Sequence, residues 1–253
     1  MYRFFVEENQ IQDRKVHITG GDVNHIKNVL RMHPGEKILV STGGIREYHC
    51  TIEDFADGEV TAAIEEVTTA HNELPSEICL FQGLPKSDKM ELIVQKAVEL
   101  GVSRIVPVEM ERCVVKLDSK KAANRVERWQ AIALGAAKQS KRMKIPRVHS
   151  VVTYKEALAM AETYDIRLLP YENASGMEHT REILEAIEPG ASIAVFIGPE
   201  GGISEEEVEK AVQIHAEPIT LGDRILRTET AGMTMLAILM YLLEGKTGQN
   251  RKE

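Results

Sequence analysis

From Glu77 to the end of the chain, short apolar segments alternate with longer segments whose apolar residues recur at helical spacing. Strands that alternate with helices form parallel sheets, because only a long crossover returns the chain to the same edge of the sheet. The sequence therefore predicts an α/β fold with helices on both faces of a parallel sheet. Strands are expected at 78–82, 104–108, 148–152, 166–169, 193–197 and 218–221, and helices at 88–100, 119–139, 154–162, 178–187, 204–215 and 228–243.

The first 72 residues follow a different pattern. Short segments rich in β-branched residues are expected to form strands at 15–19, 37–41, 48–55 and 60–67, with Asp57-Gly58 as a hairpin turn. A short helix should begin at Asp22 and stop before Pro34-Gly35. Closing such strands into a small barrel removes exposed edges. We therefore expect two domains, residues 1–72 and 73–253, joined by a linker at 71–75.

Composition excludes several classes of protein. The three cysteines, Cys50, Cys79 and Cys113, show no C-x-x-C spacing, so neither a disulfide framework nor a zinc site is expected. A reducing, cytoplasmic location fits this best. The longest apolar run, near 235–243, is too short to span a bilayer, so no membrane role is expected. No other metal-ligand cluster is visible, and none is expected.

Charge is distributed unevenly along the chain. The formal net charge of −8 alone would disfavour a nucleic-acid partner. The segment from Arg112 to Arg147, however, contains eleven basic and two acidic residues, a local excess of nine positive charges. Four of these cations, Lys120, Lys121, Arg125 and Arg128, are expected on the outer face of one helix. This stretch favours contact with nucleic-acid phosphates over a merely solvated surface.

Three strand-to-helix turns carry residues that suit a ligand site. The first, Gly198-Pro199-Glu200-Gly201-Gly202, combines three glycines, which permit close approach of a ligand, with a carboxylate that disfavours phosphate and tolerates a cationic ligand. The second, Leu221 to Ala231, offers apolar residues to flank a purine and polar residues near a helix start. The third, Gly83 to Glu91, places Lys86 and Lys89 beside a helix start, where they could contact phosphate or simply face solvent.

Together these strings resemble the ribosomal RNA small-subunit methyltransferase E family of the SPOUT, or α/β-knot, superfamily. The resemblance extends over nearly the whole chain. It is carried by Tyr2-Arg3-Phe4-Phe5, His25-Ile26, Val29-Leu30-Arg31, Gly83-Leu84-Pro85-Lys86, Asp88-Lys89, Gln95-Lys96, Glu99-Leu100-Gly101, Ala136-Ala137-Lys138-Gln139-Ser140, Gly198 to Gly202, Leu221-Gly222 and Arg224 to Ala231. The last three of these strings, from the two ligand turns, are the most specific.

The resemblance implies an N-terminal PUA-like β-barrel that binds RNA, followed by a SPOUT methyltransferase domain with a deep trefoil knot. It implies a homodimer that uses S-adenosylmethionine, leaves S-adenosylhomocysteine as product, and methylates N3 of one uridine in small-subunit (16S) ribosomal RNA, free or in the assembled subunit. No metal is required for such a transfer.

Residue roles follow from the same resemblance. Arg227 is expected to stabilise negative charge on the uracil carbonyl oxygens, and Glu200 is the second candidate catalytic residue. The expected cofactor contacts are Leu169, Ile197, Gly198, Pro199, Glu200, Gly201, Leu221, Gly222, Ile225, Leu226 and Thr228. The expected RNA contacts are Arg3, Arg31, Lys86, Lys89, Lys138 and Arg142.

Other functions remain open at this stage. A nucleotide-dependent oxidoreductase would require G-x-G-x-x-G early in the sheet, and the sequence lacks that string. A non-catalytic RNA-binding module would suit the basic stretch and the barrel but would not need the glycine turns. A SPOUT methyltransferase that acts on a different RNA nucleotide is the third alternative.

Overall fold

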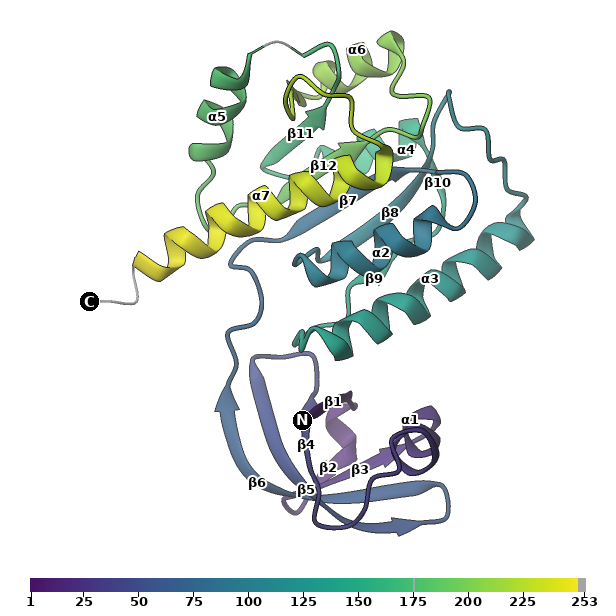
Figure 1. The fold of residues 1–253 in the computed structure, drawn as a ribbon, viewed down its shortest axis with the longest axis vertical. Helices are drawn as coiled ribbons and strands as arrows, with labels where there is room; N and C mark the ends of the chain where they lie inside the picture. The colour runs from purple at the N-terminus through teal and green to yellow at the C-terminus, as the bar shows by residue number, and fades with distance from the viewer. Residues whose placement is uncertain (175, 250–253) are drawn as a thin grey trace. The chain divides into compact units, whose positions relative to one another are not determined.

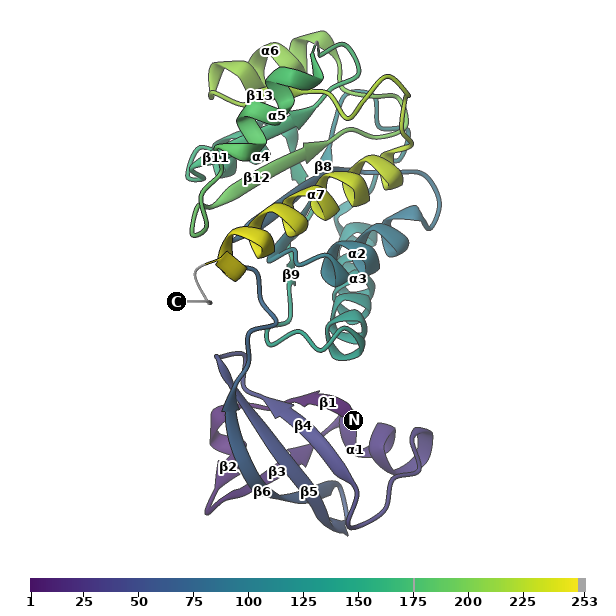
Figure 2. The same ribbon diagram turned by 60° about the vertical axis from the view of Figure 1, so that its left-hand side comes forward.

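The computed structural model describes residues 1–174 and 176–249, and for 247–249 the backbone alone (Figures 1 and 2). Residues 250–253 of the expected second domain lie outside this part. The chain divides into two compact units: Met1–Glu73 with Ala137–Ile145, and Leu74–Ala136 with Pro146–Glu253. The first unit thus follows the expected barrel segment and adds a short segment from much later in the sequence.

The first unit is a curved six-stranded sheet wrapped around its own core (Figure 2). In order across the sheet its strands are β1 (Tyr2–Phe5), β4 (Lys37–Ser41), β5 (Arg46–Ala56), β6 (Glu59–Thr69), β3 (Lys15–Thr19) and β2 (Ile11–Gln12). Alternate residues are buried in β3, where Val16 and Ile18 lie in the core, so this strand gives one face to the core. Register shifts in β5, one of them between His49 and Cys50, add the local bending that a curved sheet needs.

The expected helix after Asp22 differs in detail. A short helix, α1 (Gly21–Asn24), begins one residue earlier and continues directly into a π-helix, η2 (His25–Val29). Gly20 precedes α1 with a φ of 72°, a conformation that glycine adopts without steric cost. Asp22 therefore lies in the first turn and does not cap the helix. Strand β1, which pairs in parallel with β4, was not expected.

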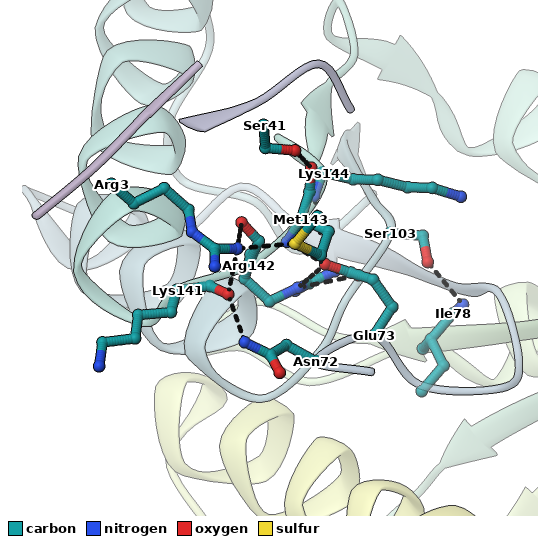
Figure 3. A network of polar contacts seen from close by, with 10 residues as sticks. All are labelled: Arg3, Ser41, Asn72, Glu73, Ile78, Ser103, Lys141, Arg142, Met143 and Lys144. Atoms are coloured by element: carbon teal, nitrogen blue, oxygen red, sulfur yellow. Dashed lines mark hydrogen bonds and ion pairs between the residues drawn. The ribbon is translucent and has the colours of Figure 1, made fainter. Parts of the chain in front are cut away.

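The late segment Ala137–Ile145 joins the first unit through buried polar contacts (Figure 3). Arg3 forms an ion pair with Glu47 and donates hydrogen bonds to the backbone carbonyls of Lys141 (2.7 Å) and Arg142 (2.9 Å). The Ser41 hydroxyl donates to the carbonyl of Met143 at 2.9 Å. These contacts pair backbone groups that would otherwise be buried without partners, so they make the segment part of the unit.

The carboxylate of Glu73 binds the same segment through several hydrogen bonds (Figure 3). It accepts hydrogen bonds from Nε of Arg142 at 3.0 Å and from Nη2 at 2.5 Å. It also accepts from the backbone N–H groups of Met143 (2.7 Å) and Lys144 (3.2 Å). Charge-assisted hydrogen bonds are stronger than neutral ones, so Glu73 is a main link between this segment and the unit.

The second unit contains the expected parallel sheet. The order across the sheet is β10-β8-β7-β12-β11-β13, and β9 also pairs with β8. The bounds are β7 (Ile78–Gly83), β8 (Arg104–Glu109), β9 (Arg147–Val148), β10 (Val152–Thr153), β11 (Ile166–Pro170), β12 (Ile193–Ile197) and β13 (Glu217–Ile219). The strand expected at 148–152 is therefore two shorter strands, both paired with β8.

Helices separate most of these strands and cover both faces of the sheet. Their bounds are α2 (Lys89–Glu99), α3 (Ser119–Gln139), α4 (Tyr154–Ala161), α5 (Met177–Glu185), α6 (Glu205–Gln213) and α7 (Thr228–Gln249). Helices α2 and α7 pack together on one face, whereas α4 and α6 lie on the other (Figures 1 and 2). The α/β fold with a parallel sheet is thus confirmed. No helix in the described chain is long and apolar enough to cross a membrane.

Replacing Glu73 by glutamine should destabilise the protein. Glu73→Gln removes the negative charge that Arg142 and two backbone N–H groups share, and we expect the free energy of unfolding to fall by about 2 kcal/mol. Urea unfolding followed by circular dichroism measures this change. Glu66→Gln, at an exposed position of β6, is the matched control and should change stability by less than about 0.5 kcal/mol. Equal effects of the two variants would contradict the role given to Glu73.

Candidate functional site

Four loops meet at one edge of the parallel sheet in the second unit. They follow β7, β11, β12 and β13, and because parallel strands all end at the same edge, their loops gather there. Three of them surround a pocket of about 430 Å³, within the range of small-molecule sites. The pocket is lined by Pro170, Tyr171, Glu172, Ile197, Gly198, Pro199, Glu200, Gly202, Ile203, Thr220, Leu221, Gly222, Arg224, Ile225, Leu226, Arg227, Thr228 and Ala231.

The end of β7 packs against the loop after β12, which lines this pocket. A Cβ atom on Gly83 would lie 2.7 Å from both the nitrogen and Cδ of Pro199, closer than any real side chain approaches. Glycine at 83 is therefore needed for the two loops to touch. The loop after β7 does not itself line the pocket, yet it fixes the position of a loop that does.

The glycines of the 198–202 loop are explained mainly by packing inside the chain. A Cβ atom on Gly198 would lie 2.7 Å from Cγ1 of Ile203, and one on Gly201 would lie 2.9 Å from Cβ of Arg112. Gly202 has a φ of 73°, which few other residues adopt. Gly198 and Gly201 are thus needed for contacts within the protein, in addition to the ligand approach expected from the sequence.

A buried polar chain ties the loop after β12 to the start of α7. Thr228 is 5% exposed. Its hydroxyl donates to the carbonyl of Gly198 at 2.6 Å and accepts from Nε2 of Gln82 at 2.8 Å. Gln82 also donates to the carbonyl of Gly83 at 3.0 Å. Because Gln82, Gly198 and Thr228 come from three separate segments, this chain of hydrogen bonds sets the spacing of the pocket walls.

Glu200 lies on the rim of the pocket, and its carboxylate faces the loop after β7. It accepts hydrogen bonds from the backbone N–H of Lys86 at 3.1 and 3.2 Å and pairs with Nζ of Lys89 at 3.0 Å. Burial acts to raise the pKa of Glu200, but the hydrogen bonds from Lys89 and from backbone N–H groups outweigh it and lower the pKa. Glu200 is therefore ionised at neutral pH.

The loop after β13 supplies apolar walls and an exposed cation. Leu221 and Leu226 are partly buried in the pocket, whereas Ile225 is 83% exposed. Arg227 lines the pocket, is exposed, and forms no ion pair with any described residue. An apolar wall next to an available guanidinium can hold a flat ring and an adjacent negatively charged group.

Most of the residues expected to contact the cofactor come together. Nine of the eleven line the pocket, namely Ile197, Gly198, Pro199, Glu200, Leu221, Gly222, Ile225, Leu226 and Thr228. Leu169 is instead fully buried in β11, and Gly201 packs on Arg112. The pocket also contains Pro170, Tyr171 and Glu172, which sequence reasoning missed. Their position at the end of β11 and directly after it was the available signal, because residues at strand ends line such sites.

The six residues expected to contact RNA lie in very different surroundings. Arg3 and Arg142 are 2% and 4% exposed, so their side chains have almost no surface to offer a phosphate. Lys138 pairs with Asp22, and Lys89 pairs with two glutamates. Arg31 and Lys86 are exposed and form no ion pair within the described residues. Burial therefore disfavours the expected RNA contact for Arg3 and Arg142, and for the other residues this contact stays a prediction.

Family models match most of the chain. The description "RNA methyltransferase domain" matches residues 72–240, and "RNA methyltransferase PUA domain" matches residues 18–65. The first match covers the parallel sheet and the pocket, and the second covers most of the curved sheet.

Individual relatives match over most of their length. Ribosomal RNA small subunit methyltransferase E of Bacillus subtilis is 37% identical, over 96% of this chain and 98% of the relative. The protein of the same name from Synechocystis is 32% identical, over 96% of this chain and 78% of the relative. The crystal structure of the enzyme of that name from Neisseria gonorrhoeae, bound to S-adenosyl methionine, superimposes with a TM-score of 0.83 at 34% identity, covering 96% of this chain and 98% of that one.

Removing the Thr228 hydroxyl should destabilise the protein. Thr228→Val keeps the side-chain shape but leaves the Gly198 carbonyl without this donor and Nε2 of Gln82 without this acceptor. We expect the free energy of unfolding to fall by about 1–2 kcal/mol, measured by urea unfolding. Thr230→Val, at an exposed position of the same helix, should have little effect. A stable Thr228→Val variant would show that the buried polar chain is dispensable.

Proposed function

The chain belongs to the ribosomal RNA small-subunit methyltransferase E family and is an RNA methyltransferase that uses S-adenosylmethionine; from this premise we propose that it methylates N3 of one uridine in 16S ribosomal RNA. The observation that carries the proposal is the pocket between the loops after β11, β12 and β13, with an arginine at its edge that forms no ion pair among the described residues. S-Adenosylhomocysteine would be the product.

The pocket residues fit this cofactor. Leu221, Ile225 and Leu226 provide apolar surface for an adenine ring. Glu172 and Glu200 place carboxylates in the lining, which suits a molecule that carries a sulfonium and an ammonium group. The bound cofactor supplies an electrophilic methyl group on sulfur. The described residues contain no cluster of His, Cys, Asp and Glu side chains that could hold a metal ion, and in-line methyl transfer from a sulfonium depends mainly on positioning.

Arg227 is the residue best placed to act on the base. N3 of uridine lies on the Watson–Crick edge, so the base must be unpaired or flipped out before this atom is accessible. Loss of the N3 proton places negative charge on the neighbouring carbonyl oxygens. An exposed guanidinium that no carboxylate neutralises can stabilise that charge. We therefore assign this role to Arg227.

Glu200 suits an electrostatic role better than a role as proton acceptor. Its pKa is lowered, and a weak base with a low pKa accepts a proton poorly at neutral pH. Its negative charge, held in place by Lys89, would favour a cationic ligand. We therefore propose that Glu200 shapes the charge of the pocket.

RNA contact is assigned to the exposed cations. Arg31 follows the π-helix of the first unit with a φ of 52°, and Lys86 lies in the loop after β7 in the second. Lys120, exposed on α3, and Arg125, partly buried on the same helix, continue the basic stretch. Phosphate contacts of this kind give affinity with little sequence preference, so recognition of one uridine must come from contacts to the base and to the RNA shape.

Assembly follows the same premise. We propose a homodimer in which the face formed by α2 and α7 contributes to the interface, because Leu92 and Tyr241 leave apolar surface exposed there. The trefoil knot is proposed on family grounds. From action on ribosomal RNA we propose a cytoplasmic location.

Two measurements test the proposed function. Isothermal titration with S-adenosylmethionine should show binding at one site per chain. Mass mapping of 16S ribosomal RNA from cells with and without the gene should show one methylated uridine that depends on the gene. Absence of binding would favour a non-catalytic RNA-binding module. A methyl group at another nucleotide would favour a SPOUT methyltransferase of different specificity.

Arg227→Ala should abolish most of the activity. Loss of one charge-stabilising donor lowers turnover by about 100-fold or more, and we expect cofactor binding to stay measurable by calorimetry. Arg181→Ala, at an exposed position of α5 outside the pocket, is the control. Turnover by Arg227→Ala at the wild-type rate would remove this residue from the mechanism.

A further inference from the structure

Lys89, in the first turn of α2, lies between two carboxylates from separate segments of the second unit. Its Nζ atom is 3.0 Å from Oε1 of Glu200 and 3.3 Å from Oε2 of Glu229. Glu200 belongs to the loop after β12, and Glu229 lies in the first turn of α7. One ammonium group therefore links three segments of chain beside the pocket.

These three segments meet at the pocket walls, although Lys89 does not itself line the pocket. Pro199 and Glu200 form part of one wall, and Arg227 and Thr228, directly before Glu229, form part of another. The backbone N–H of Lys86 holds the same Glu200 carboxylate. The ion pairs of Lys89 thus connect the loop after β12 with the start of α7 near the rim, in addition to the buried hydrogen bonds of Gln82 and Thr228.

The electrostatics of the cluster favour an intact ion pair. The side chains of Lys89, Glu200 and Glu229 are 27%, 25% and 17% exposed, so water screens their charges only in part. The hydrogen bond that Lys89 donates to Glu200 is the largest effect that raises the pKa of Lys89, which keeps the ammonium protonated. Without this cation, two partly buried carboxylates would repel each other across the pocket rim.

We propose that Lys89 is a positioning residue for the cofactor site: its ammonium holds the loop after β12 and the start of α7 at the separation that S-adenosylmethionine requires. This replaces the role in RNA contact expected from sequence, since the charge of Lys89 is already neutralised within the chain. The inference rests on the proposed function of the pocket. Lys86, three residues away and exposed, keeps the role in phosphate contact.

The test compares Lys89→Met with Lys89→Arg and with the matched control Lys86→Met. Each protein is titrated with S-adenosylmethionine by calorimetry, and RNA affinity is measured by filter binding at several salt concentrations. Lys89→Met should bind S-adenosylmethionine about 10-fold more weakly, while the salt slope of RNA binding stays unchanged. Lys89→Arg can still pair with both glutamates and should bind within about threefold of wild type. Thermal melts check that each variant is folded.

Lys86→Met should show the opposite pattern. Its affinity for S-adenosylmethionine should match wild type, and the salt slope of its RNA binding should fall by about 1. The inference is overturned if Lys89→Met binds S-adenosylmethionine like wild type, or if Lys89→Arg is as weak as Lys89→Met. If wild-type protein binds no S-adenosylmethionine, the proposed function itself fails, and the two failures are therefore distinct.

Discussion

The parallel pairing of β7 with β12 is the constraint on which the site depends. The strands stay in register to the pair Gln82 and Ile197, so the loops that follow them leave the sheet side by side. Glycine at 83 then lets one loop touch Pro199 of the other. The side chain of Gln82, the residue before Gly83, donates a hydrogen bond to the hydroxyl of Thr228. A shift of this register by one residue would turn Gln82 to the other face of the sheet and remove both contacts.

Local periodicity was sufficient to predict most of the fold. Helix α3 runs from Ser119 to Gln139 as expected, because its apolar spacing is visible within the helix itself. The parallel sheet follows from alternation of strands and helices. Strand β1 and the packing of Ala137–Ile145 could not be predicted in this way, because Arg3 and Arg142 lie 139 positions apart. A contact so distant in sequence leaves no local periodic signal.

The site was predicted in part, for a related reason. Glycine-bearing turns at strand ends located two pocket walls, since parallel strands end at a common edge. The β11 wall was missed because Pro170, Tyr171 and Glu172 form no recognisable string. The sequence also does not show that Gly201 is needed because Arg112 packs against it. Residue types thus located the site, but the close contacts that make glycine necessary depend on tertiary packing.

The distribution of charge along the sequence likewise does not show which cations pair with carboxylates in the fold. The stretch from Arg112 to Arg147 has an excess of nine positive charges in sequence, yet several of its cations pair with carboxylates, including Lys121 with Asp118, Arg128 with Glu91, and Lys138 with Asp22. Each paired cation has less charge to offer to a phosphate. Binding of RNA releases counterions in proportion to the phosphates neutralised. The salt dependence of binding is therefore set by cations that have no acidic partner in the fold, and it should be weaker than the number of basic residues suggests.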